Sequence, residues 1–273
     1  MQPDRSLLVV LTALAAEAKA IKSTAGADVA GRHTQLGHGP QEYRAARRAL
    51  HIRTVQCGMG RERVFHGTAL ADAWGVGSIG ISGGLAPGLP RGAIVLAERI
   101  IESVAGKNTK YHKYLPDEKL LEKLETALRV SGITYRRGAI LCSAKPLLTA
   151  SEKAAAHGTT GAIAVDMESG GAAAAAAAQS LPFFSVRVIC DPAERSLDGR
   201  LLKGVDPEGN GRPLRMLVAV LKNPWLIVGA VRVARDFSVA MASLRRTWPI
   251  IQAPLDDFYR NRLTSVPDHA EQA

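Results

Sequence analysis

The pair Met167-Glu168 stands just before seven consecutive alanines at positions 172–178. Alanine is the best helix former, so this run predicts a helix that packs tightly against its neighbours. A carboxylate placed before an apolar helix costs free energy unless a partner satisfies it. Two vicinal ribose hydroxyls would satisfy Glu168, and Met167 would then cover the flat face of the sugar. The alternative for Glu168 is a capping acid, which the helix macrodipole favours.

Two further carboxylates could move protons. Asp191 directly follows the apolar segment 182–190, and Glu17 falls early in a predicted helix. Apolar burial raises the pKa of a carboxyl group and lets it donate a proton near pH 7, so Asp191 is a candidate general acid. The alternatives are an Asx-turn before Pro192 for Asp191 and an ordinary first-turn glutamate for Glu17.

The elements that must position these residues alternate between strands and helices. Apolar runs predict buried strands at residues 6–13, 52–57, 76–82, 93–101, 135–142 and 182–190. Helices are expected at residues 15–23, 61–74, 117–131 and 151–158, the last with Ser151 as its cap. This alternation predicts an α/β three-layer sandwich whose central sheet is mixed and mainly parallel.

Four predicted strand ends carry the residues of interest, and ligands of such sheets bind beyond the carboxyl ends of the strands. These ends are followed in turn by Glu17, by Gly58 to Gly60, by Ser82 to Gly84 and by Asp191. The two glycine-rich turns can expose N–H groups to an anion, or they can simply connect elements tightly. We expect the four ends to form one site.

Composition narrows the partners. The 273 residues carry a net charge of +10, which favours nucleic acid, anionic membrane or phosphate-bearing ligands. With 5% aromatic residues and no stacking-rich motif, we expect no nucleic-acid partner. The three cysteines lack metal-ligand spacing, so we expect no metal and a reducing compartment. No signal peptide and no long apolar span are recognisable, which predicts a cytoplasmic protein.

The C-terminal region changes character from about residue 211. Residues 213–246 are expected to form two helices broken at Asn223-Pro224, with basic residues beside apolar residues at helical spacing. Such helices could bind an anionic membrane surface, or they could pack on the core or form a dimer interface. The polar tail after Pro249 is expected to fray, and the basic segment 107–113 to be a solvated loop.

Four ordered motifs carry a resemblance to a known family. They are TALAAE at 12–17, ISGGLAP at 81–87, AVDMES at 164–169 and RVICD at 187–191. The chain resembles the nucleoside phosphorylase/nucleosidase superfamily over residues 6 to about 195, and most closely the methylthioadenosine/S-adenosylhomocysteine nucleosidase branch. Residues 55–63 and the basic C-terminus further resemble the hopanoid-associated phosphorylase subgroup, which is implicated in removing adenine from adenosylhopane.

The resemblance implies roles for the acidic residues. Asp191 would protonate N7 of the leaving purine, and Glu17 would orient and deprotonate the attacking water. Glu168 would bind the ribose 2′- and 3′-hydroxyls, with Met167 against the sugar. The other substrate-binding residues implied are Ser82, Gly83, Ile81, Ala144 and Leu147, the last two through the backbone that walls the base site.

Hydrolysis and phosphorolysis both stay open, and hydrolysis is favoured. By resemblance, Ser78 stands where phosphorolytic relatives have a phosphate-binding arginine, and Ile81 stands where a contacting serine is usual. An apolar side chain cannot donate a hydrogen bond, and losing a charge-assisted phosphate contact costs about 1.5–3 kcal/mol. Gly58, Gly60 and Arg61 remain a second place where phosphate or water could bind. No cofactor is expected, and inorganic phosphate would be a co-substrate only for phosphorolysis.

Three functions therefore compete: an adenosylhopane N-glycosidase, a nucleosidase or phosphorylase of small soluble nucleosides such as methylthioadenosine, and a non-catalytic nucleoside-binding protein at the membrane surface. The expected partners are a small or lipid-linked nucleoside, a membrane surface reached through 213–246, and a second copy in a homo-dimer. The expected organisation is a catalytic domain at 1–210, a helical extension at 211–248 and a tail at 249–273. A location at the inner face of the cytoplasmic membrane would follow from membrane binding.

Overall fold

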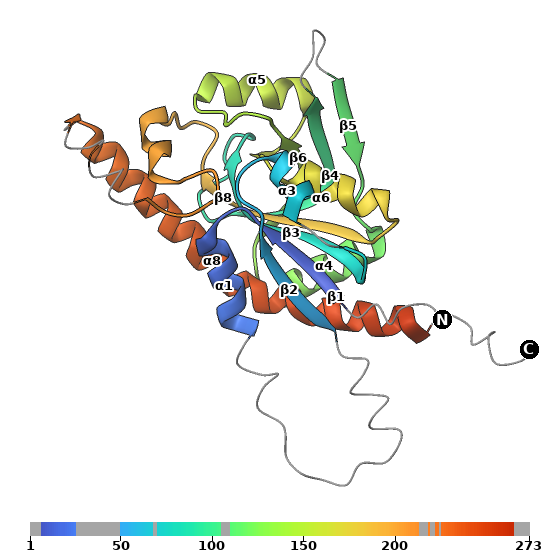
Figure 1. The fold of residues 1–273 in the computed structure, drawn as a ribbon. Helices are drawn as coiled ribbons and strands as arrows, with labels where there is room; N and C mark the ends of the chain where they lie inside the picture. The colour runs from blue at the N-terminus through green and yellow to red at the C-terminus, as the bar shows by residue number, and fades with distance from the viewer. Residues whose placement is uncertain are drawn as a thin grey trace, which may run out of the picture.

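The computed structural model describes residues 7–25, 50–67, 70–104, 110–212, 218, 222–223 and 225–264. In these ranges eight strands form one sheet (Figure 1). The strands are β1 (Leu7–Thr12), β2 (His51–Gln56), β3 (Ala73–Gly84), β4 (Ile94–Val104), β5 (Lys110–Tyr114), β6 (Tyr135–Cys142), β7 (Ala164–Asp166) and β8 (Phe183–Asp191).

The sheet is mixed and mainly parallel, as predicted. Its order is β2-β1-β3-β7-β6-β4-β5, and β8 pairs with both β3 and β4. The pairs β1–β2, β1–β3, β3–β8, β4–β6 and β6–β7 are parallel, whereas β3–β7, β4–β5 and β4–β8 are antiparallel. The contacts of β8 with β3 and β4 give the sheet a barrel-like closure. The four strands that precede the candidate residues, β2, β1, β3 and β8, are consecutive parallel neighbours.

Helices cover both faces of the sheet and confirm the three-layer sandwich (Figure 1). On one face α1, α4 and α8 pack against Phe184, Val186 and Val188 of β8. On the other face α3 and α6 pack against alternate strand residues such as Ile189. The helices are α1 (Ala15–Ala25), α3 (Arg61–Gly67), α4 (Glu118–Val130), α5 (Ala150–Thr160), α6 (Ser169–Ala178), the 3-10 helix η1 (Gly199–Gly204) and α8 (Leu226–Thr264).

The alanine run forms α6, as expected, and its small residues let neighbouring elements approach closely. Ala172, Ala173 and Ala176 are buried against the sheet. A Cβ on Gly171 would lie 2.9 Å from the carbonyl oxygen of Arg61 in α3. Because only glycine tolerates that approach, the start of α6 sits directly beside the turn that follows β2.

Several local expectations were wrong. The helix expected at 61–74 ends at Gly67, and Trp74 belongs to β3. The cap of α5 is Thr149 rather than Ser151, with Glu152 completing a capping box. Of the expected loop 107–113, residues from Lys110 form β5 along the edge of β4, and residues 107–109 lie outside the described part.

The C-terminal helix is longer than expected. Pro249 and Pro254 lie inside α8, which continues to Thr264 instead of fraying after residue 249. Proline removes a helical hydrogen bond, but the buried side chains of Ile251, Leu255 and Tyr259 hold this part of the helix on the core. The first of the two expected helices falls largely outside the described residues, and the proposed domain boundaries stay a prediction. Within the described ranges, no helix is long and apolar enough to cross a bilayer.

Candidate active site

The carboxyl ends of β2, β1, β3 and β8 meet at one edge of the sheet. The pairing of Thr12 with Gln56 and of Gly83 with Asp191 brings these ends together. The backbone N–H of Cys57 also donates to the carbonyl of Thr12 at 2.9 Å. The four strand ends therefore lie at one edge of the sheet. That they form one site, and the roles of the residues there, stay predictions.

Glu17 is buried, and backbone N–H groups from two elements hold its carboxylate. Oε2 accepts hydrogen bonds from the N–H groups of Ala13 and Leu14 at 3.0 and 2.8 Å. Oε1 accepts one from Ile81 of β3 at 2.8 Å. A Cβ at Gly80 would lie 2.6 Å from Oε1, so glycine makes the room that Glu17 occupies. Glu17 thus bonds the N–H groups that precede its own helix and also reaches β3, and its role as a base stays a prediction.

Burial raises the pKa of Glu17 above its ordinary value. The N–H donors of Ile81 and Leu14 and the positive charge of Arg187 act in the opposite direction. A carboxyl group with a raised pKa can exchange a proton nearer to neutral pH than an exposed glutamate can.

Asp191 ends β8 and lies over Gly83 of β3. An ideal Cβ on Gly83 would stand 3.5 Å from both carboxylate oxygens, and the Asp191 side chain is 15% exposed. Oδ2 accepts a hydrogen bond from Nζ of Lys153 at 2.5 Å. Burial raises the pKa of Asp191, while the Lys153 ammonium acts to lower it.

Glu168 is buried at the start of α6 beside the turn that follows β2. Oε1 accepts a hydrogen bond from the N–H of Gly60 at 2.9 Å, and Oε2 accepts one from Met167 at 3.3 Å. Among the described residues its side chain makes no capping hydrogen bond, although it stands at the N-cap position of α6. Burial and the negative charge of Asp166 raise the pKa of Glu168.

Arg187 and Asp166 form a buried ion pair, to which the sequence analysis assigned no role. Nε of Arg187 donates to Oδ2 of Asp166 at 2.6 Å, and Nη2 donates to Oγ of Ser78 at 2.7 Å. Oδ1 of Asp166 accepts from the hydroxyl of Ser169 at 2.7 Å. One signal could have identified the pair: a charged residue inside the apolar strand β8 needs a buried counter-charge. Ser78, which stands where phosphorolytic relatives were expected to have a phosphate-binding arginine, accepts a hydrogen bond from this guanidinium.

The remaining residues expected to bind substrate lie in two places, on β3 and in the loop after β6. Ser82 is buried, and its Oγ has no hydrogen-bond partner among the described residues, a costly arrangement that a ligand or water would relieve. Gly83 packs against Val165 and Asp191. The side chain of Ile81 packs into an apolar cluster. In the loop between β6 and α5, Ala144 is exposed and Leu147 is half-buried.

The turn expected to bind phosphate or water already has protein partners. The N–H of Gly60 donates to Glu168, and Arg61 forms an ion pair with the buried carboxylate of Glu102. The loop at Pro207 covers the other side of the turn, where a Cβ on Gly58 would lie 2.7 Å from the Pro207 carbonyl oxygen. The anion held at Gly60 in this structure is therefore a protein carboxylate.

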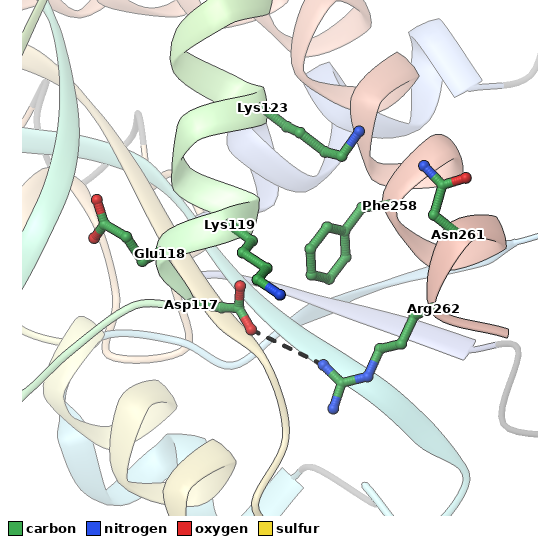
Figure 2. A pocket seen from close by; sticks show the side chains of 7 residues that line it. All are labelled: Asp117, Glu118, Lys119, Lys123, Phe258, Asn261 and Arg262. Carbon is green, nitrogen blue, oxygen red and sulfur yellow. Dashed lines mark ion pairs between the residues drawn. The ribbon is translucent and has the colours of Figure 1, made fainter. Parts of the chain in front are cut away.

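A cleft of about 580 Å³ lies between α4 and the end of α8 (Figure 2). Its lining includes Lys119, Lys123 and Phe258, and Asp117 and Arg262 face each other across it at 3.9 Å. The N–H of Asp117 bonds the carbonyl of Phe183 at the opposite end of β8 from Asp191. Since a strand rises about 3.3 Å per residue, this cleft lies roughly 26 Å from Asp191 and is not part of the site.

A smaller cleft of about 220 Å³ begins four residues after Asp191. It lies between the segment that follows β8 and the first turns of α8, and its lining is mixed. Leu197, Leu201, Trp225, Leu226 and Val233 line it together with the charged Arg195, Asp198 and Arg232. The α8 face next to it exposes apolar side chains.

Residues 8–222 match the family model of the phosphorylase superfamily. A comparison with curated protein sequences finds no match. Among solved structures, 5′-methylthioadenosine/S-adenosylhomocysteine nucleosidase from Helicobacter pylori, bound to butyl-thio-DADMe-Immucillin-A, has a TM-score of 0.63 at 14% identity, covering 92% of this chain and 98% of that chain. Futalosine hydrolase of Helicobacter pylori has a TM-score of 0.63 at 14% identity, covering 92% and 97%. The Neisseria meningitidis nucleosidase, in complex with methylthio-immucillin-A, has a TM-score of 0.63 at 14% identity, covering 90% and 98%. At these identities the likeness establishes a common fold.

Proposed function

The chain belongs to the phosphorylase superfamily and is an enzyme of the N-glycosidase or nucleoside phosphorylase class, and we propose that it hydrolyses the N-glycosidic bond of an adenine nucleoside. The observation that carries this proposal is the placement of Glu17 and Asp191 against neighbouring residues of β3, over Gly80 and Gly83. Glu168 lies close enough for its charge to act on Glu17 and on the Arg187 guanidinium.

The proposed reaction uses each carboxyl group once. Asp191 donates its proton to N7 of the purine, so the base leaves neutral while the sugar becomes oxocarbenium-like. Glu17 accepts a proton from water, whose oxygen forms the new bond to C1′. Glu168 accepts hydrogen bonds from the ribose 2′- and 3′-hydroxyls, for which it keeps capacity because a carboxylate has about four acceptor positions and Glu168 uses two of them here. Solvent then returns the proton from Glu17 to Asp191.

Three engaged groups favour water over phosphate as the nucleophile. The N–H of Gly60 donates to Glu168, Arg61 pairs with Glu102, and Arg187 pairs with Asp166. A phosphate dianion would have to displace a carboxylate from one of these donors and would gain little net energy by doing so. Phosphorolysis remains the alternative within the same class.

We further propose that the substrate is lipid-linked, and that it is adenosylhopane. The supporting observations are the partly apolar cleft that begins four residues after Asp191 and the exposed side chains of Trp225, Ile227, Val228 and Val231 on the adjoining turns of α8. The resemblance of residues 55–63 to the hopanoid-associated subgroup names this lipid. A soluble nucleosidase is the second candidate, because the structural neighbours include methylthioadenosine/S-adenosylhomocysteine nucleosidases.

The same face of α8 supports contact with the inner face of the cytoplasmic membrane. Arg232 and Arg235 are exposed close to the apolar side chains, and residues 209–235 contain no Asp or Glu. Basic residues near an anionic leaflet contribute about 1 kcal/mol each. The competing occupant of this face is a second copy in a homo-dimer, which the mass of the purified protein from light scattering would reveal.

One incubation separates the candidate functions. Purified protein is given methylthioadenosine or adenosylhopane, with and without phosphate, and the sugar product is weighed by mass spectrometry. We expect adenine and ribosylhopane from adenosylhopane in either buffer. A sugar 1-phosphate would identify a phosphorylase, and turnover of methylthioadenosine alone would identify the soluble nucleosidase. Binding of nucleoside without release of base would leave only a binding protein.

A further inference from the structure

Lys153 is buried, whereas the other residues of its helix, α5, are exposed or half-buried. Within α5, every residue of which is described, Lys153 is the buried residue, with 0% of its surface exposed. The neighbouring Ala154 and Ala155 face solvent. The helix therefore turns an ammonium inward and apolar methyl groups outward. Burying a lysine is unfavourable unless its charge is paired and its N–H groups are bonded.

The contacts of Nζ meet this requirement at one place, the end of β8. Nζ donates to Oδ2 of Asp191 at 2.5 Å, to the carbonyl oxygen of Pro192 at 3.0 Å and to that of Arg195 at 3.0 Å. An ammonium has three N–H donors and no acceptor. A neutral amine would face one of the three oxygens with a lone pair, so the geometry fits the charged form.

We propose that Lys153 is a positioning residue for the general acid, holding Oδ2 of Asp191 so that Oδ1 is the oxygen that exchanges a proton with the leaving base. This inference rests on the proposed function, because it assigns Lys153 a part in the same proton transfer. The anchor acts through Asp191 and through the backbone of the segment that follows it. Lys153 itself does not touch the substrate.

The charges around Asp191 make Lys153 the principal electrostatic influence on it. The charged groups of the described residues that act most strongly on Asp191 are Lys153 from α5 and Arg195 from the following segment. Arg195 forms an ion pair with the buried Asp236 of α8, a carboxylate that it shares with Arg91. The charges of Lys153 and Arg195 both lower the pKa of Asp191 against the effect of burial, and Lys153, which also bonds the carboxylate directly, has the larger effect.

Removing the charge at position 153 should move the kcat–pH profile in one direction. A general acid works only when protonated, so activity falls as the pH rises through its pKa. Without the ammonium the pKa of Asp191 rises, and the alkaline limb of the kcat–pH profile moves to higher pH. An opposite charge within hydrogen-bond distance lowers a carboxyl pKa by about 1–3 units, so the limb should move by about one pH unit or more.

The test compares Lys153→Met, Lys153→Arg and the matched control Lys119→Met, which makes the same change on an exposed part of α4. We expect Lys153→Met to lower kcat by about 10-fold or more, the effect of losing a charge-assisted hydrogen bond, with KM nearly unchanged. The alkaline limb of its kcat–pH profile should move to higher pH. Lys153→Arg should keep the wild-type limb, and Lys119→Met should match wild type. If the alkaline limb of Lys153→Met stays at the wild-type pH, the inference is overturned and Lys153 only stabilises the fold.

Two further measurements keep the inference testable. If Lys153→Met does not fold, Lys153→Gln retains two N–H donors without the charge, and the same upward movement of the limb is expected. If wild type releases no base, the proposed function fails, while the effect of Lys153 is still measured from the 13C titration of the Asp191 carboxyl. A 13C titration in which Lys153→Gln and wild type coincide would overturn the inference independently of turnover.

Discussion

The backbone N–H of Gly60 donates a hydrogen bond to Oε1 of Glu168 at 2.9 Å, joining residues 108 positions apart. A glycine-rich turn of this kind suits a phosphate, but here it holds a protein carboxylate. The same contact orients the side chain proposed to bind the ribose hydroxyls. One hydrogen bond therefore supports both the proposed sugar site and the preference for water as the nucleophile.

Gly80→Ala tests whether the position of Glu17 matters. A Cβ at this residue would lie 2.6 Å from Oε1 of Glu17 and force the carboxylate away from Ile81. Because a displacement of about 1 Å can cost ~100-fold in rate, we expect kcat to fall by about that factor. The control is Gly158→Ala in α5, where an added Cβ meets nothing within 4 Å. Wild-type kcat in Gly80→Ala, measured by adenine release, would show that Glu17 need not stay in place.

The pH dependence of kcat/KM tests the role of Glu17 as the base. A base works only when deprotonated, so activity is lost as the pH falls through its pKa. Burial raises the pKa of Glu17 above its ordinary value, so we expect the acidic limb of the profile at a higher pH than an exposed glutamate would give. Glu17→Gln should lower kcat by about 10²–10⁴-fold and abolish that limb. A profile that keeps the same acidic limb in Glu17→Gln assigns it to another group.

Much of the fold follows from local patterns that could be read in the sequence. The apolar runs that formed β1, β3 and β8 are buried on both faces, and the leucines of α4 repeat at helical spacing. Two strands, β5 and β7, were missed because their sequences contain no such pattern. The three residues of β7 are too few to show a pattern, and β5, at the sheet edge, contains only lysine, histidine and tyrosine.

The candidate site residues were easier to single out in the sequence than the residues that support them. The acids Glu17, Glu168 and Asp191 stood out because each adjoins a strand end or an apolar helix. Arg187 and Lys153 did not, because their partners lie 21 and 38 residues away and no local pattern connects them. The end of α8 was misjudged because the polar sequence after Pro249 predicted fraying. Packing of this part of the helix on the core outweighs the hydrogen bonds that Pro249 and Pro254 remove.

Asp191→Asn should cost stability as well as activity. The substitution leaves the ammonium of Lys153 buried without a counter-charge, and breaking a buried pair costs on the order of 3 kcal/mol. We expect a lower free energy of unfolding in urea, at a pH where Asp191 is ionised in the folded wild type. The double variant Lys153→Met with Asp191→Asn should recover most of that loss. Equal stability of Asp191→Asn and wild type would contradict the buried pair.

Charge reversal on α8 tests the membrane surface. Arg232→Glu with Arg235→Glu should reduce co-sedimentation with vesicles containing phosphatidylserine by about 10-fold or more, since each basic residue contributes about 1 kcal/mol. The matched control is Lys119→Glu with Lys123→Glu, which makes the same charge change at the distant cleft of α4 (Figure 2). Equal losses in both variants would mean that net charge alone attracts the protein to the vesicle.

Isotope incorporation tests the central claim most directly. Wild type and Glu17→Gln are incubated with an adenine nucleoside in H2(18)O that also contains phosphate, and the released sugar is weighed. The account predicts adenine together with a free sugar carrying one 18O at C1′ from wild type, at a rate at least ~100-fold above that of Glu17→Gln. A sugar 1-phosphate, or no released adenine, would contradict it.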